Sequence, residues 1–261
     1  WCRNEHQCYN LPDLILMNFF FHIGRYFLMI KYTFTKFTKW NVLKKLIFQE
    51  IDDLIIGSIG IVAFMSFLIG GVVAIQTALA IENPFLPGNL IGFATRQSVV
   101  LEFAPTLISI IMAGKVGSFI TSSIGTMRVT EQIDALEVMG INSFNYLIFP
   151  KIISLLLYPF LITLAMFLGI LGGYVASVYA GFSTSFDFIQ GIQLDFKVFH
   201  IIYTYIKTIL FAIVLATIPS YHGFFMKGGA LEVGKASNIS FVWTSSVIII
   251  INFIVTQLLL A

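Results

Sequence analysis

The sequence predicts an all-α integral membrane protein: an N-terminal interfacial helix followed by five transmembrane helices, with one short cytoplasmic helix between the spans. Of the 261 residues, 58% are hydrophobic and only 11% are charged, whereas an average soluble domain is about 45–50% apolar and about 25% charged. Residues 54–80, 152–186 and 236–261 carry no charged side chain, and each run exceeds the about 20 apolar residues that cross a bilayer. So few charges cannot cover a soluble globule, which excludes an ordinary cytosolic enzyme.

Charge and cysteine content narrow the class of partner. Lys and Arg number 15 against 13 Asp and Glu, a net charge of +2, which argues against a nucleic-acid partner. Cys2 and Cys8 are the two cysteines, and no second pair completes a four-ligand zinc site. We therefore predict no metal site and interpret the segment as a reduced, solvated tail. Residue 1 is tryptophan, which is consistent with a trimmed chain or one that begins within a longer reading frame.

The first predicted element is a helix in the membrane interface, over residues 14–37. The segment is rich in Phe, Leu and Ile, yet basic and titratable side chains interrupt it, as in helices whose polar face turns toward lipid headgroups. A sixth, strained crossing is the alternative. Residues 1–50 are thus assigned as a tail with an amphipathic helix, and residues 51–261 as a five-span domain. The interrupting side chains are His22, Arg25, Lys31 and Lys36.

The five predicted spans cover residues 54–80, 97–125, 152–181, 198–219 and 238–260. The third uncharged run is too long for one crossing, and the Gly-Phe-Ser-Thr-Ser sequence at 181–185 supplies a turn that ends it. The second span contains Glu102 and Lys115, and the fourth contains Lys207.

Most Lys and Arg residues fall on one side of these spans. With the N-terminus inside, the two outer loops, residues 81–96 and 182–197, hold only Arg96 and Lys197. Basic residues favour the cytoplasmic side of a membrane. We therefore expect a cytoplasmic N-terminus and, after an odd number of spans, a C-terminus on the outer side.

Small residues recur at every fourth position of the third span: Gly169, Gly173, Ser177 and Gly181. This spacing places them on one helical face, and such faces let helix backbones approach closely in lipid. The face fits packing within the chain or an interface between subunits, and the first of these is favoured.

The inside loop after the second span predicts a short amphipathic helix over residues 131–139. Thr130 is a suitable N-cap and Gly140 a suitable stop, so the helix is about 13 Å long and cannot span a bilayer. Separate apolar and acidic stripes suit docking into a groove on a soluble partner. A connector that packs only against its own spans is the alternative. The apolar stripe is Ile133, Leu136 and Met139, and the acidic stripe is Glu131, Asp134 and Glu137.

Residues 113–140 read AGKVGSFITSSIGTMRVTEQIDALEVMG, and residues 227–238 read KGGALEVGKASN. The longer segment, above all GTMRVTEQIDALEVMG with Pro150 beyond it, strongly resembles the MlaE family of permeases, the membrane subunits of lipid-transporting ABC systems. The segment at 227–238 resembles the family's other inside loop. The resemblance covers about residues 50–261, and residues 1–50 match only loosely.

The resemblance implies a homodimer with an interfacial helix and five spans in a bacterial inner membrane, its C-terminus periplasmic. It implies a cytoplasmic ABC ATPase dimer that binds ATP and Mg²⁺, so that this chain carries no cofactor. An MCE-domain protein on the outer side, and phospholipid in a cavity at the dimer interface, are also implied. The short loop helix would couple the permease to the ATPase, through Glu131, Gln132, Ile133, Asp134, Leu136, Glu137, Met139 and Gly140.

Residues 229–236 nearly match the Walker A pattern, but the position after Lys235 is Ala236. That position needs Ser or Thr to hold Mg²⁺, and the motif needs a preceding strand. We therefore expect a partner to hydrolyse ATP.

Charges within the spans are the candidates for the substrate site, because each costs about 2.5–3.5 kcal/mol at mid-membrane and needs a partner or a wet cavity. Glu102 and Lys115 are about 20 Å apart along one helix and cannot pair, whereas a Glu102–Lys207 contact between helices is possible. Structural pairing or snorkelling is the alternative for each. The resemblance places Glu102, Lys115 and Lys207 near the lipid cavity, and Asn252 of the last span is the fourth candidate for it. This chain has Leu101 where the family often has Arg, and Asn252 where it often has Asp.

The leading function is therefore a permease subunit of an ABC transporter that moves phospholipid or a related lipid between inner and outer membranes. An ion-coupled secondary transporter would predict repeated halves with broken helices, and no internal repeat is visible. An intramembrane enzyme would need convergent catalytic groups, and we assign none; a lone His222 is interpreted as a local hydrogen-bonding residue. A non-transporting membrane anchor of a lipid-handling complex is the remaining alternative.

Overall fold

The computed structural model describes residues 11–35, 40–81 and 88–260, and these ranges contain helices and turns but no β-strand. The Cys2–Cys8 tail and Lys36 lie outside the described residues. In chain order the elements are α1 (Leu11–Thr33), α2 (Trp40–Leu54), the 3₁₀ helix η1 (Ile56–Ser58), α3 (Ile59–Ala80), α4 (Asn89–Ser98), the π-helix η2 (Val99–Leu107), α5 (Ile108–Met112), the π-helix η3 (Ala113–Gly117), α6 (Ser118–Val129), α7 (Gln132–Val138), α8 (Ser143–Leu155), α9 (Tyr158–Tyr179), α10 (Ser185–Gln193), α11 (Val198–Phe225) and α12 (Ala230–Leu260).

Five helical stretches among the described residues are long and apolar enough to cross a membrane, which confirms the predicted all-α membrane class and number of spans. Each stretch is longer than the predicted span, and the first and third are longer because each joins two successive helices, α2 with α3 and α8 with α9. The stretches are Trp40–Ala80, Asn89–Val129, Ser143–Tyr179, Val198–Phe225 and Ala230–Leu259.

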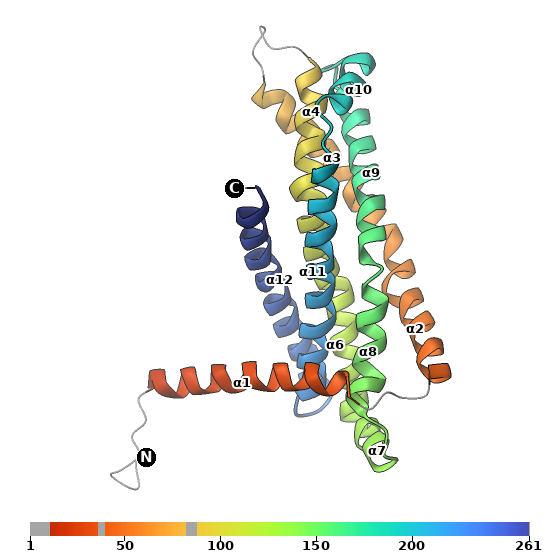
Figure 1. Cartoon of the computed structure of the whole chain (residues 1–261), viewed down its shortest axis with the longest axis vertical. Coiled ribbons are helices and arrows are strands. Elements are labelled where there is room, and N and C mark those ends of the chain that lie inside the picture. The colour runs from red at the N-terminus through yellow and green to blue at the C-terminus, as the bar shows by residue number, and fades with distance from the viewer. Residues whose placement is uncertain (1–10, 36–39, 82–87, 261) are drawn as a thin grey trace.

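The N-terminal helix α1 lies across the bundle rather than along it (Figure 1). It ends at Thr33, and α2 begins as a separate helix that leads through η1 into α3. The end of α1 is fastened to α8, because Asn145 Nδ2 donates to the Thr33 carbonyl at 2.8 Å and Asn142 Nδ2 donates to the Tyr32 carbonyl at 3.0 Å. The predicted boundary at residue 50 falls inside α2.

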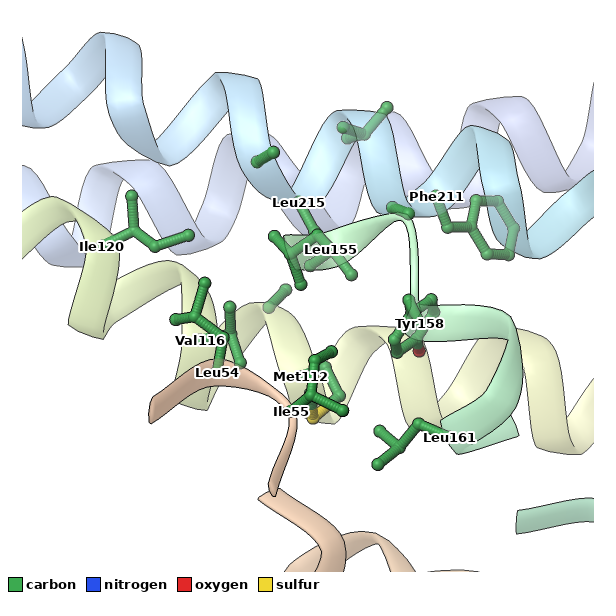
Figure 2. Close-up of a cluster of buried hydrophobic side chains, with 14 of the residues drawn as sticks. Leu54, Ile55, Met112, Val116, Ile120, Leu155, Tyr158, Leu161, Phe211 and Leu215 are labelled. Carbon is green, nitrogen blue, oxygen red and sulfur yellow. The ribbon is translucent and has the colours of Figure 1, made fainter. Parts of the chain in front are cut away.

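The largest hydrophobic core surrounds the break between α8 and α9 (Figure 2). Leu155 and Tyr158 flank this break and are fully buried against Leu215 and Phe211 of α11. The Tyr158 hydroxyl lies 2.7 Å from Ser109 Oγ, so the polar end of the buried ring has a hydrogen-bond partner. The core therefore joins the second, third and fourth spans into one unit.

Helices α3 and α9 pack with their backbones in direct contact. A Cβ added at Gly70 would lie 1.8 Å from the Gly169 carbonyl oxygen, and one at Gly172 would lie 2.0 Å from the Phe67 carbonyl oxygen. Only glycine permits this approach, because any Cβ would overlap main-chain atoms of the other helix. The small residues of the third span thus pack within this chain.

The predicted face of small residues needs one correction. Gly169, Gly173 and Ser177 are buried in α9, but Gly181 lies beyond the helix end at Tyr179. Gly181 has φ 74° and no neighbour within 4 Å of a built Cβ, so it serves as a left-handed stop after α9. The four-residue spacing counted one residue of the predicted 181–185 turn as part of the helical face, and it missed Gly172, which is buried in α9.

We expect Gly70→Ala to destabilise the protein by about 1–3 kcal/mol, the usual cost of overpacking, because the added methyl group meets the Gly169 backbone. The measurement is thermal unfolding of the purified protein in detergent. Gly60→Ala is the matched control on the same helix, since nothing lies within 4 Å of a Cβ built there. Equal melting temperatures for the two variants would contradict the proposed backbone contact.

Candidate functional site

The short helix predicted after the second span is α7, which lies beyond the end of the bundle near which α1 crosses (Figure 1). It contains seven residues rather than the nine predicted. Gly140 has φ 74°, which places it in the left-handed conformation that commonly follows a helix end. The Glu137 carboxylate accepts a hydrogen bond from Ser143 Oγ at 2.9 Å, so α7 is also tied to the start of α8.

The predicted N-cap of this helix is wrong. Thr130 belongs to the end of α6, where its hydroxyl donates to the Thr126 carbonyl at 2.9 Å. The residue before α7 is Glu131, in the left-handed region at φ 58° and without a side-chain cap. Instead of capping α7, the Thr130 hydroxyl bonds to the carbonyl four residues earlier, which is a common local hydrogen bond of threonine in helices. The chain then reverses sharply at Glu131, and Arg128 Nη1 contacts Asp134 Oδ1 at 2.6 Å across the turn.

The apolar stripe of α7 is divided between the protein's own core and its surface. Ile133 is fully buried and belongs to the main core, Leu136 is half-buried, and Met139 is 64% exposed. Ile133 is therefore not available to a partner, because α7 packs back against α6 and α8. Val138, which the stripe did not include, is 87% exposed beside Met139. The exposed apolar surface of this segment is thus Val138 and Met139.

Glu102 of η2 is at the centre of a polar cluster between the second, fourth and fifth spans. Its Oε1 lies 2.9 Å from Lys207 Nζ, and its Oε2 accepts from Asn252 Nδ2 at 3.1 Å. The Lys207 side chain is fully buried, whereas Glu102 is 38% exposed. The helix contact that the sequence allowed is therefore present, and Asn252 joins it from α12.

Three further residues complete this cluster and were not predicted. The Tyr203 hydroxyl and Thr256 Oγ1 lie 3.2 and 3.3 Å from Glu102 Oε1, and Thr106 Oγ1 donates to Asn252 Oδ1 at 3.0 Å. The sequence did contain a signal, since Tyr203 precedes Lys207 by four residues and Thr256 follows Asn252 by four. Polar residues one helical turn apart share a face. The carboxylate is therefore held by donors from two other spans.

The segment that carries Glu102 is a π-helix, Val99–Leu107, with Pro105 inside it. Proline has no N–H to donate to the carbonyl of the preceding turn, and the Leu101 carbonyl, four residues before Pro105, accepts from Lys207 Nζ at 3.3 Å. Wider π turns are often found at functional sites. From this π-helix the Glu102 carboxylate contacts side chains of both α11 and α12.

The comparisons with known proteins assign the family. A family model described as permease MlaE matches residues 47–258, a stretch that includes α7 and every residue of the Glu102 cluster. The chain belongs to the MlaE permease family. The resemblance expected from residues 113–140 is thereby confirmed, and the protein is an ABC transporter permease with several membrane-spanning helices.

Several proteins similar to this MlaE permease are named as probable ABC transporter permeases. A probable ABC transporter permease protein of Rickettsia bellii is 32% identical over 202 residues, 77% of this chain and 78% of the relative. One of Synechocystis is 34% identical over 172 residues, 65% of each chain, and one of Pyropia yezoensis is 30% identical over 203 residues, 77% of this chain and 76% of the relative.

Lys115 of the permease lies apart from the Glu102 cluster. Its Nζ donates to the Gly57 carbonyl at the junction of α2 and α3. It also borders an open groove between α6 and α12 that is lined by Ser118, Ser122 and Asn238. The four charged or polar residues predicted for one cavity therefore divide into a cluster of three, with Lys115 elsewhere.

The segment of the MlaE permease that resembles Walker A lacks the required context. Gly229 precedes α12, and the chain before it is the end of α11 rather than a strand. Within the described ranges, no three His, Cys, Asp or Glu side chains are grouped so as to hold a metal ion.

Proposed function

We propose that this permease moves phospholipid, or a related lipid, between the inner and outer membranes of a bacterial envelope. A partner ATPase dimer would dock on α7 and supply the energy by hydrolysing ATP with Mg²⁺. The proposal also includes a second copy of the chain and an MCE-domain protein on the outer side. The localisation proposed is the inner membrane, with a cytoplasmic N-terminus and a periplasmic C-terminus.

The exposed pair Val138 and Met139 carries the proposal for the ATPase. Two large apolar side chains, 87% and 64% exposed, stand at the tip of a helix that projects from the end of the bundle (Figure 1). Exposed apolar surface framed by charged residues is typical of a docking site, and Glu131, Asp134 and Glu137 supply that frame.

The Glu102 cluster supports a role for polar chemistry within the apolar interior. Intramembrane charges are expensive and are usually functional, and Glu102 remains partly exposed even though Lys207 is buried. We infer that the exposed edge of Glu102 faces the proposed lipid cavity between two copies. Lys207 would keep that carboxylate ionised and in place.

The test is ATP-dependent lipid transfer by the permease reconstituted with its ATPase and MCE partner. We expect a fluorescent phospholipid to move between donor and acceptor vesicles when ATP and Mg²⁺ are present, and to stay in place with a non-hydrolysable analogue. Transfer at equal rates under both conditions would contradict an ATP-driven function. An ion gradient that replaced ATP would instead support a secondary transporter.

A further inference from the structure

A cavity of about 700 Å³ lies between α1, the end of α11 and the first half of α12, and none of the residues of the Glu102 cluster lines it. We propose that this cavity binds the phosphate-bearing headgroup of an anionic phospholipid from the cytoplasmic leaflet. It is a second lipid site, distinct from the proposed cavity at Glu102. The volume of the cavity is in the range of cavities that hold small organic ligands. The inference rests on the proposed lipid-transport function.

Positive charge predominates around this cavity. Arg25, Lys227 and Lys235 line it, and Glu232 is the one acidic side chain in the lining. Glu232 is already paired with Lys235 at 2.6 Å. Among the residues that the structure describes, Arg25 and Lys227 form no ion pair, so both charges are uncompensated. A phosphate group is the complement that two such cations select.

Arg25 is held in place while its donors remain available. Its guanidinium group stacks over the Phe225 ring at 3.8 Å from the centroid, and a stacked guanidinium can still donate in its own plane to phosphate oxygens. Lys227 is exposed in the short link between α11 and α12, so its flexible side chain can reach the same ligand. One cation is therefore preorganised and the other adapts.

The wall formed by α1 is fixed to α11 by two side-chain hydrogen bonds. His22 Nδ1 lies 2.6 Å from the Tyr221 hydroxyl, and the Tyr26 hydroxyl lies 2.6 Å from Thr217 Oγ1. The cavity is thus a built feature of the monomer and does not depend on a second copy.

The opposite wall favours a lipid over free phosphate. Ile239, Trp243 and Val247 follow one another at every fourth residue of α12 and line the cavity together, which places them on one helical face. Ile239 is 50% and Trp243 is 49% exposed, so this stripe continues outward as apolar surface. Tryptophan is common at the headgroup level of membranes. A ligand that fits has an anionic end and an acyl chain.

The test is lipid binding to the full-length purified permease, measured by native mass spectrometry with phosphatidylglycerol or phosphatidylcholine. We expect Arg25→Gln/Lys227→Gln to lower the affinity for phosphatidylglycerol by about thirtyfold, about 2 kcal/mol, since each cation near a headgroup contributes about 1 kcal/mol. Binding of zwitterionic phosphatidylcholine should fall by a smaller factor, because its choline cation offsets the charge of the phosphate that the two cations contact.

Lys31→Gln/Lys45→Gln is the matched control, because it also removes two exposed cations, one of them from α1, that do not line the cavity. An equal loss of phosphatidylglycerol binding in this control would overturn the proposal in favour of general surface attraction. Lys227→Gln alone serves where Arg25→Gln impairs folding, since Lys227 is exposed, and about a fivefold loss is expected from it.

Two further outcomes separate this inference from the proposed function. Inorganic phosphate that binds alone and displaces phosphatidylglycerol would overturn the lipid assignment and identify a site for soluble phosphate. If the wild-type protein transfers lipid with ATP but Arg25→Gln/Lys227→Gln binds phosphatidylglycerol as the wild type does, this second site is overturned and the proposed function stands. Absence of lipid transfer by the wild type, with the charge-dependent binding present, would contradict the proposed function while leaving a lipid-binding site.

Discussion

Glu102→Leu is expected to destabilise the permease by about 1–3 kcal/mol, the usual cost of leaving a buried polar group without its partner, because Lys207 is fully buried while Glu102 is 38% exposed. The change leaves the fully buried Lys207 ammonium without its carboxylate, and the Leu101 carbonyl, 3.3 Å from Nζ, is then the nearest acceptor. The measurement is thermal or denaturant unfolding of the purified protein. Unfolding at the wild-type midpoint would show that the pair contributes little to the fold.

The double variant Glu102→Leu/Lys207→Met is the control for this prediction. Replacing both members of a buried pair by apolar residues is often neutral or stabilising, so we expect it to recover most of the lost stability. A double variant as unstable as Glu102→Leu would contradict the role of the uncompensated cation. A stable double variant that no longer transfers lipid would place these charges in the transport step rather than in the fold.

Val138→Asp/Met139→Asp is expected to abolish co-purification of the ATPase, with an affinity loss of about thirtyfold or more. A central apolar anchor of an interface typically contributes about 2 kcal/mol or more, which by itself is about thirtyfold, and an aspartate in a desolvated contact adds an unpaired charge. Because both side chains are exposed, the fold of the permease itself should not change. The measurement is ATPase recovery with the tagged permease and its dissociation constant.

Phe186→Asp on α10 is the matched control, since Phe186 is 74% exposed at the other end of the bundle (Figure 1). It should leave ATPase recovery as in the wild type. Ile133→Asp is unsuitable as a docking test, because Ile133 is fully buried and its loss would disturb the core. Unchanged ATPase recovery with Val138→Asp/Met139→Asp would exclude the tip of α7 as the docking surface.

The membrane class and the number of spans follow from the sequence because hydrophobicity over about 20 residues is a strong signal. The bounds of the helices do not follow from it, since charged residues such as Asp52 and Asp53, which precede the apolar run, are also helical and belong to α2. The turn sequence at 181–185 did indicate where α9 ends, but the four-residue spacing wrongly placed Gly181 on the helical face, and its positive φ shows that it lies in the turn.

The sequence predicted one contact of the candidate site, Glu102 with Lys207, but not the other contacts of Glu102. Sequence distance along one helix excluded a Glu102–Lys115 pair, and the allowed Glu102–Lys207 contact is present. Which residues of α12 face Glu102 depends on how that helix is rotated and on the π-helical widening at η2, and neither is encoded in hydropathy. The burial of Ile133 likewise depends on the sharp reversal at Glu131, a backbone conformation that its residue type does not indicate.

The direct contact of α3 with α9 has a consequence for motion. Side chains in an ordinary helix interface can change rotamer and let two helices slide, but the carbonyl of Gly169 meets the Gly70 backbone with no side chain between them. The first and third spans therefore move as one rigid body. Any change of shape during a working cycle has to occur where side chains separate the helices, and α12, the least buried of the five spans, has the most freedom to shift.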